Sequence, residues 1–218
     1  AWPEATRNAF TEYVRGGGGV VFIHESDNAF PDWKEYNQMI GLGGWEGRNE
    51  NSGPYVYLVD GEWVRDNSPG RGGHHGRPTP FVINVRAADH PIMKGLPEKW
   101  MHTRDELYCL MRGPAENMTI LGSGFSDPAT GGSNREEPLL LALSFGEGRI
   151  FHTMLGHDST ARACVGFIET LRRSAQWAAT GEVTLPVPED FPTAEESRSR
   201  DLEALMAAAT ATAEPAGE

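Results

Sequence analysis

The chain has 218 residues, which suits one large domain rather than two. Its 19 lysines and arginines are outnumbered by 31 aspartates and glutamates, so the net charge at neutral pH is -12. This acidic balance argues against nucleic acid and anionic lipid as partners, and no apolar run is long enough to cross a bilayer. We expect a small-molecule ligand and neither a nucleic-acid nor a membrane partner, and we leave a homo-oligomer open.

The two cysteines, Cys109 and Cys164, are too few for a disulfide framework and lack the spacing of a zinc site. We expect both to be small core residues rather than a bridge. The chain opens at Ala1 without a methionine or a signal peptide, which indicates a processed start or a piece of a longer protein. We expect a cytoplasmic location.

The first forty residues predict a helix, a buried strand and a second helix. Apolar residues at helical spacing after Pro3 predict a helix of about three turns, which ends at the four glycines of 16–19. Val20–Ile23 is a continuous apolar run, typical of a buried parallel strand, and Phe30–Ile40 reads as a helix. This order favours the α/β class.

Later segments continue the alternation of strands and helices. The predicted strands are Tyr55–Val59, Phe81–Val85, Met118–Leu121, Leu139–Leu143 and Arg149–Leu155. A tight turn at Glu147-Gly148 precedes the last strand, and a long helix is predicted over Arg162–Ala179, with Asp158 or Ser159 as its cap.

The composition changes after residue 183. Three prolines are followed by a predicted amphipathic helix over Glu195–Ala209 and by an alanine- and threonine-rich end, which we expect to be disordered. We therefore divide the chain into an α/β domain, 1–183, and a partly disordered Pro-rich and Ala-rich extension, 184–218.

Histidines beside acidic residues follow two of the predicted strands. His24-Glu25 comes directly after Ile23, and His157-Asp158 comes after Leu155. Open α/β sheets bind ligands at the carboxyl ends of their strands. A single histidine there is more often structural, but two at corresponding positions favour a shared site.

Two further segments carry weaker signals. Asp105 and Glu106 are adjacent carboxylates, which more often face solvent than a ligand. His74 and His75 lie in a glycine-rich loop, where imidazoles can bind a metal ion or form hydrogen bonds to hydroxyl groups of a ligand. The chain has no GxSxG, GxxxxGK[ST], GxGxxG or HExxH motif and no cysteine at a predicted strand end, so it predicts none of those chemistries.

Five segments resemble, in order, the trehalose-utilisation (ThuA-like) family. They are Gly17–His24, Gly43–Trp45, His90–Leu96, Asp105–Tyr108 and the stretch Gly146–Phe151 that leads to Gly156-His157. The resemblance spans residues 13–179. It implies a flavodoxin-like, three-layer α/β sandwich with a mainly parallel sheet, similar to class I glutamine amidotransferases.

The chain differs from the family and its amidotransferase relatives in two respects. The family's amino-terminal strand–helix–strand unit has no counterpart in this chain, so we expect an apolar sheet edge beside Val20–Ile23 that is exposed or covered by another chain. The amidotransferase relatives carry a cysteine at the turn where this chain has His24-Glu25, which argues against glutaminase activity.

The function that the resemblance implies is sugar catabolism, beside dehydrogenases that form 3-keto sugars. A ketone at C3 acidifies the C2 proton, so a base and an acid can drive elimination, hydrolysis or isomerisation of a 3-keto glycoside. No cofactor is established, and a divalent metal ion held by histidine and carboxylate is left open. The alternative is a non-catalytic carbohydrate-binding or partner-docking module on the same scaffold.

The candidate residues divide into two sets. The expected catalytic residues are His24, Glu106, His157 and Asp158, and the expected sugar-binding residues are Trp45, Arg48, His74, His75, Asp105 and Tyr108. We expect His24, Glu106 and His157 to converge at the carboxyl edge of the sheet.

Overall fold

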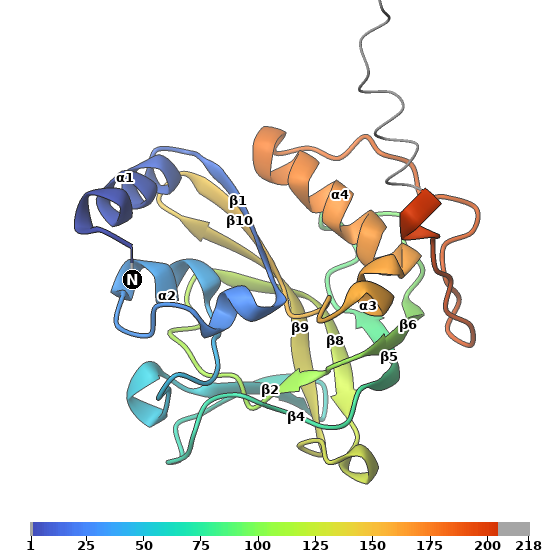
Figure 1. The fold of residues 1–218 in the computed structure, drawn as a ribbon, viewed down its shortest axis with the longest axis horizontal. Coiled ribbons are helices and arrows are strands. Elements are labelled where there is room, and N and C mark those ends of the chain that lie inside the picture. Colours follow the sequence, from blue (N-terminus) through green and yellow to red (C-terminus); the bar gives the residue numbers. More distant parts are fainter. Residues whose placement is uncertain (1, 205–218) are drawn as a thin grey trace, which may run out of the picture.

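The computed structural model describes residues 2–204, which form a curled sheet with helices on both sides (Figure 1). The helices are α1 (Glu4–Arg15), α2 (Lys34–Ile40), α3 (Ser159–Ala163) and α4 (Val165–Thr180), with short 3-10 helices η1 (His24–Asn28), η2 (Glu50–Ser52) and η3 (Pro128–Thr130). The strands are β1 (Gly19–Ile23), β2 (Tyr55–Val59), β3 (Glu62–Asp66), β4 (His74–His75), β5 (Thr79–Val85), β6 (Lys99–Asp105), β7 (Tyr108–Cys109), β8 (Met118–Ser126), β9 (Arg135–Phe145) and β10 (Gly148–Thr153).

The main sheet is mixed, and the expectation of a mainly parallel sheet is wrong. Its strand order is β1-β10-β9-β8-β5-β6, and only β1 and β10 pair in parallel. The reason lies in the connections: β9 ends at Phe145 and β10 begins at Gly148. A two-residue link can only reverse the chain, whereas a parallel pair needs a crossover of about a dozen residues. The α/β class itself is correct.

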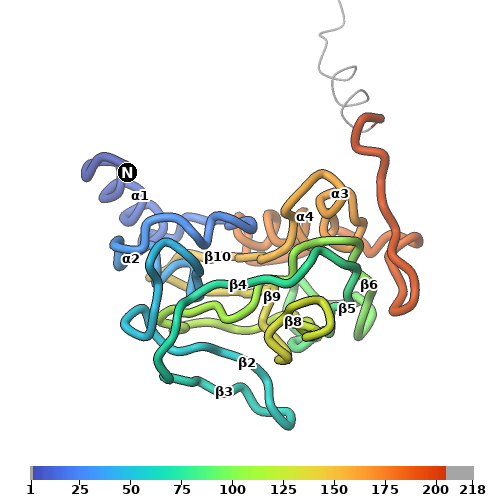
Figure 2. The backbone as a smooth tube through the Cα atoms, turned by 60° about the horizontal axis from the view of Figure 1, so that its bottom comes forward, coloured from blue at the N-terminus to red at the C-terminus, as the bar shows by residue number. Residues whose placement is uncertain are grey.

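The strand directions bring the carboxyl ends of β1, β10, β8 and β6 to one edge of the sheet. Because the pairs from β10 to β6 are all antiparallel, alternate strands point the same way, so β1, β10, β8 and β6 share a direction. Helix α4 contacts β1, β10 and β6, and the tube view shows how the sheet curls beneath it (Figure 2). The curl thereby brings the distant strand β6 towards β1 and β10.

Two predicted helices differ from the observed ones. The predicted helix over Phe30–Ile40 begins only at Lys34, because Phe30 has a left-handed backbone (φ 49°). The predicted helix over Arg162–Ala179 is broken at Cys164, whose ψ of 128° is not helical. Among residues 2–204, no helix has the length and apolar character that a membrane span requires.

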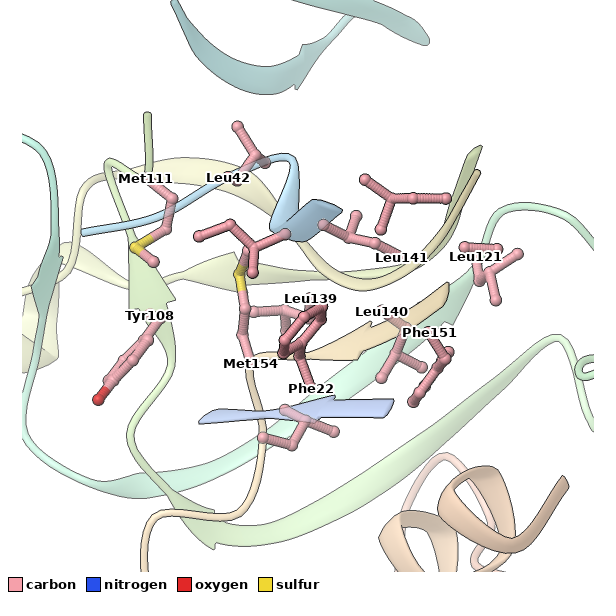
Figure 3. Close-up of a cluster of buried hydrophobic side chains, with 14 of the residues drawn as sticks. Phe22, Leu42, Tyr108, Met111, Leu121, Leu139, Leu140, Leu141, Phe151 and Met154 are labelled. Atoms are coloured by element: carbon pink, nitrogen blue, oxygen red, sulfur yellow. The ribbon is translucent and has the colours of Figure 1, made fainter. Parts of the chain in front are cut away.

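The core lies around the central strand β9, whose residues Leu139–Leu143 are all buried. Phe22 of β1 and Phe151 of β10 pack into the same cluster (Figure 3). Burial of each such side chain contributes roughly 1.5–3 kcal/mol. Cys109 and Cys164 are free and buried, which confirms that they are core residues.

The edge strand β1 pairs only with β10 among the described residues, and Val20, Val21 and Ile23 are half-buried. The expected missing strand–helix–strand unit stays a prediction. The segment after α4 packs back on the sheet, where the backbone N–H of Met101 donates to the carbonyl of Thr193.

Part of the predicted helix over 195–209 is irregular, since helical backbone is assigned only to 202–204. The remainder of that helix, and the alanine- and threonine-rich end predicted to be disordered, lie outside the described residues.

Arg173 of α4 explains how the segment His90–Leu96 is held. Its buried guanidinium donates to the backbone carbonyls of Pro91, Ile92, Lys94 and Leu185. One side chain thus ties together the loop after β5, the helix α4 and the segment that follows it.

Candidate functional site

Three side chains from distant parts of the chain meet at one point. His24 follows β1, Glu106 follows β6, and His157 lies between β10 and α3. Nε2 of His24 lies 3.2 Å from Nδ1 of His157 and 3.8 Å from Oε2 of Glu106, and that Nδ1 lies 3.2 Å from the same Oε2. The predicted convergence is therefore observed, while the catalytic roles of these residues stay a prediction.

His24 is fixed in one orientation beneath the surface. Its Nδ1 lies 2.8 Å from the carbonyl oxygen of Met154, which can only accept, so Nδ1 carries the hydrogen and Nε2 keeps a lone pair. The residue is 3% exposed and has a left-handed backbone, with φ of 45°. Such a conformation costs about 1–3 kcal/mol and tends to occur at functional sites. The lone pair of His24 thus points at His157 and Glu106.

Asp105 has a different place from the one expected of a sugar-binding residue. It is 2% exposed, and both carboxylate oxygens are occupied within the protein. Oδ1 accepts from the backbone amides of Glu106 (2.8 Å) and His157 (3.1 Å), and Oδ2 accepts from the amide of Gly156 (2.7 Å) and from the ring of His102 (2.9 Å). Asp105 therefore cannot bond a sugar; it joins the two loops that carry Glu106 and His157.

The charges of Asp105 and His102 support this arrangement. Burial opposes ionisation of Asp105, but the hydrogen bonds from His102 and the backbone amides lower its pKa. Burial likewise opposes the charge on His102, yet the interactions with Asp105 and Cys164 together outweigh it and raise the pKa of His102 to about 9. A buried ion pair thus lies directly beneath the site.

Aromatic rings form a wall on one side of the cluster. The ring of Tyr108 lies 4.1 Å from the ring of His24, and the ring of Trp45 lies 4.5 Å from that of Tyr108 (Tyr108 is drawn in Figure 3). Burial, together with nearby acidic groups, raises the pKa of Tyr108, so its hydroxyl stays protonated. Tyr108 is 3% exposed, and its ring packs against the rings of His24 and Trp45, so it is not free to stack on a ligand as expected. Trp45 is half-buried, and its expected contact with a sugar stays a prediction.

The adjacent histidines 74 and 75 point to different places. Strand β4 pairs with β7, so His75 lies opposite Tyr108 and its Nε2 comes within 3.7 Å of Oε1 of Glu106. Nδ1 of His75 donates to the carbonyl of Gly76, which leaves Nε2 with the lone pair. His74 instead lies 2.9 Å from the carbonyl of Gly131 and does not reach the cluster. Of the two histidines expected to bind a sugar, only His75 lies beside the cluster.

Arg48 and Asp158 also differ from their expected roles. Arg48 is buried, and its terminal nitrogens donate to the carbonyls of Asn28, Ala29 and Gly44 and to the side chain of Asn37. It organises the loop around Trp45 rather than presenting a free guanidinium.

Asp158 caps α3 by accepting from the backbone amide of Ala161, and it pairs with Arg104 at 2.9 Å. The hydrogen bond from Ala161 and the pairing with Arg104 lower its pKa. The structure therefore assigns Asp158 a capping role, an alternative that its position before a predicted helix already offered.

Two groups that support the site were not predicted. One is the carbonyl of Met154, which carries no signal in a sequence. The other is His102, which stands three residues before Asp105 in a segment whose sequence does not predict a strand.

A cavity of about 520 Å³ lies beside η1 and the loop before α2, and the cluster residues are not part of its lining, which consists of Arg7, Glu25, Asn28, Ala29, Phe30, Pro31, Asp32, Trp33 and Glu46. Glu25 directly follows His24, and Glu46 directly follows Trp45. The volume lies in the usual range for small-ligand pockets, about 300–1,000 Å³.

The chemistry open to the cluster follows from its donors. Within residues 2–204, His24, Glu106 and His157 are the group of histidine, cysteine and carboxylate side chains close enough together to bind one metal ion. The same groups can exchange protons with a bound ligand. Either use requires the three atoms to face a common point, as they do.

Comparison with known proteins places the chain in a family. The family model for trehalose utilisation (ThuA) matches residues 1–178. A crystal structure described as a ThuA-like protein, from Parabacteroides merdae, is 55% identical with a TM-score of 0.89 and covers 92% of this chain and 74% of its own. A second ThuA-like structure, from Bacteroides uniformis, is 16% identical with a TM-score of 0.52 and covers 83% and 67%, which shows likeness of fold alone.

A search of curated proteins finds no match to this chain. The family match nevertheless covers most of its length, and the sequence identity to one solved relative is high. The chain therefore belongs to the trehalose-utilisation (ThuA) family.

Proposed function

We propose that this protein is a carbohydrate-catabolic enzyme that removes the proton next to the ketone of an oxidised sugar, such as a 3-keto glycoside. The observation that carries the proposal is the meeting of His24, Glu106 and His157 beside the rings of Trp45 and Tyr108. Membership of a family linked to trehalose utilisation supports a sugar as the substrate. Proton-transfer groups beside an aromatic wall are what this chemistry requires.

The reaction begins at C2 of the sugar. A base takes the C2 proton, and the electrons of that C–H bond form the enolate of the C3 ketone. The enolate then expels the C1 substituent as an alcohol, which takes up a proton, and leaves a C1–C2 double bond; reprotonation at C2 gives isomerisation instead. Addition of water across the double bond completes net hydrolysis of the glycoside.

His75 is the group best placed to act as the base. Its Nε2 carries a lone pair and faces the cluster at 3.7 Å from Glu106, while its Nδ1 is fixed by Gly76. Nδ1 holds one proton permanently, so Nε2 is free to take up and return another. The enolate oxygen needs positive charge nearby, which the cluster of His24, Glu106 and His157 can supply through a protonated imidazole or a bound cation.

The cavity beside η1 has a lining that suits a neutral ligand better than a phosphorylated one. Its lining contains the carboxylates of Glu25, Asp32 and Glu46 against the single guanidinium of Arg7. Carboxylates accept hydrogen bonds from sugar hydroxyls but repel phosphate. The aromatic side chains of Phe30 and Trp33 add apolar surface to the same lining.

The test is exchange and turnover of a 3-keto glucoside in D₂O, followed by NMR at the C2 proton and by product analysis. We expect exchange at C2 and release of the aglycone with the wild-type chain. His75→Asn should reduce the rate by 100-fold or more, in line with the loss of a general base. His74→Asn is the matched control, because its side chain points to Gly131 and should leave the rate unchanged. Binding of the sugar without C2 exchange would overturn the proposal and favour a carbohydrate-binding module.

A further inference from the structure

We propose that His24, Glu106 and His157 bind one divalent first-row transition metal ion of the zinc class, with a coordination position left open for substrate. The donor set of two imidazole nitrogens and one carboxylate is that of catalytic zinc sites. This inference deepens the proposed function, because it names what stabilises the enolate. Metal binding itself can be measured without any sugar.

The distances between the three donor atoms carry the first part of the argument. Their separations are 3.2, 3.2 and 3.8 Å. Tetrahedral coordination with bonds of about 2.1 Å separates its corner atoms by about 3.4 Å. An ion can therefore sit at bonding distance from all three atoms without any rearrangement of the side chains.

The lone pair of His24 points towards the other two proposed ligands. Nε2 of His24 is unprotonated because Nδ1 donates to Met154, and this hydrogen bond from the non-ligating nitrogen to a carbonyl is typical of metal-binding histidines. Its neighbours within the cluster are an imidazole nitrogen and a carboxylate oxygen, both of which are electron-pair donors. Three donors that face one another gain most from a shared cation between them.

The positions of the ligands are set by the protein around them. Asp105 fixes the backbone of Glu106 and His157 through one carboxylate oxygen. His24 is held in a strained left-handed conformation at 3% exposure. Burial and backbone together hold the His24 ring in one direction, which a metal ligand requires.

The type of ligand indicates which metal ion would bind, and the exposure of the ligands indicates a free coordination position. Calcium and magnesium prefer oxygen ligands, whereas two imidazoles favour zinc or its first-row neighbours. The side chain of His157 is 38% exposed, and Glu106 meets His75 on its other oxygen. Three protein ligands leave a fourth position free, which a sugar carbonyl or enolate oxygen can occupy.

Zinc titration of the chelator-treated, dialysed protein tests the inference, with stoichiometry from elemental analysis and with cobalt(II) absorption as a second readout. We expect one zinc ion per chain. His157→Ala and Glu106→Gln should each weaken zinc binding at least 100-fold and abolish the tetrahedral cobalt spectrum. His74→Ala and Asp158→Asn are matched controls, a histidine and an acid outside the cluster, and should bind zinc as the wild type does.

Other outcomes overturn the inference. Absence of stoichiometric zinc binding by the folded wild-type chain would do so, and so would unchanged binding by a folded His157→Ala variant. Failure of the proposed function looks different: zinc binds as expected, but no C2 exchange occurs. Full turnover by protein freed of metal would overturn the metal's role in stabilising the enolate while leaving the proposed function intact.

Discussion

Asp105 holds His157 in place without touching its ring: Oδ1 of Asp105 accepts the backbone amide of His157 at 3.1 Å. The same oxygen accepts the amide of Glu106 at 2.8 Å, so a single atom sets the spacing of two cluster residues. Because Asp105 reaches neither substrate nor the reacting atoms, it is a positioning residue. Its importance is measurable separately from that of the residues it positions.

Asp105→Asn should therefore impair the site without removing any of its three members. The amide side chain cannot accept all four hydrogen bonds, and it leaves the buried His102 without its counter-charge. We expect zinc affinity to fall about 10–100-fold, as for other residues that orient metal ligands, and stability to fall by roughly 3 kcal/mol. Zinc titration and denaturant unfolding of the same variant measure the two effects.

Asp158→Asn is the control for Asp105→Asn, since Asp158 is also an acid next to a cluster residue, but it caps α3 and pairs with Arg104 instead of binding the cluster loops. Asparagine caps a helix about as well as aspartate does, so the substitution should cost under about 1 kcal/mol, through the lost pairing with Arg104, and leave zinc affinity unchanged. If Asp105→Asn lowered stability while zinc affinity stayed at the wild-type value, the positioning role would be wrong.

Glu137 makes stability depend on pH. It is 2% exposed, and burial raises its pKa from 4.5 to about 7. A raised folded-state pKa means that the folded chain binds more protons than the unfolded chain between pH 4.5 and 7. The stabilisation is therefore complete below pH 4.5 and is lost as pH rises through 7, by roughly 1.4 kcal/mol for each pH unit.

Glu137→Gln should remove this part of the pH dependence, because the amide mimics the protonated acid at every pH. Relative to the wild type, the variant should gain stability as pH rises from about 5 to 7, and the gain should level off above pH 7. Denaturant unfolding of both proteins across that range is the measurement. A constant difference between them would show that Glu137 does not titrate in this window.

Arg173→Met should destabilise the protein far more than the neighbouring Arg172→Met. Arg173 is buried and donates to four backbone carbonyls, which the substitution leaves without partners. Arg172 is mostly exposed and pairs only with Glu169. We expect a loss of about 3 kcal/mol for Arg173→Met and under about 1 kcal/mol for Arg172→Met. Equal melting temperatures for the two variants would contradict the stabilising role of the four hydrogen bonds from Arg173.

The contrast between Asp105 and Glu106 shows where prediction from sequence stops. Both were visible as adjacent carboxylates, but one is buried under four hydrogen bonds and the other faces the cluster. Neighbouring residues at a strand end point in opposite directions, and the strand that decides which is which could not be recognised. Lys99–Asp105 alternates charged and apolar residues too irregularly to predict a strand.

His24 and His157 were easier to place, because each follows an apolar run that could only be a buried strand. Their meeting with Glu106 depended on the direction of β6, which no local pattern reveals. The parallel sheet was wrong for a local reason that was available: the turn at Glu147-Gly148 was recognised, and a turn so short makes its two strands antiparallel. A consistent reading of that turn predicts the mixed sheet.

Gly73→Ala should disturb sugar binding through Trp45. Gly73 has φ of +87°, and a Cβ there would lie 2.6 Å from the backbone nitrogen of Trp45. The substitution therefore adds a collision to the strain of a left-handed backbone, and it pushes Trp45 away from Tyr108. We expect KM for a 3-keto glucoside, or Kd for its unreactive analogue, to rise about 10-fold, which corresponds to a loss of roughly 1.4 kcal/mol of binding free energy.

Gly61→Ala separates the collision from the strain. Gly61 lies in the turn between β2 and β3 with φ of +85°, and a Cβ there meets nothing within 4 Å. Both variants pay the left-handed backbone penalty of about 1–2 kcal/mol, but only Gly73→Ala displaces Trp45. Gly61→Ala should thus lower the melting temperature and leave sugar affinity unchanged. If both variants lost sugar affinity equally, the effect would be general destabilisation, and the stacking role of Trp45 would have no support.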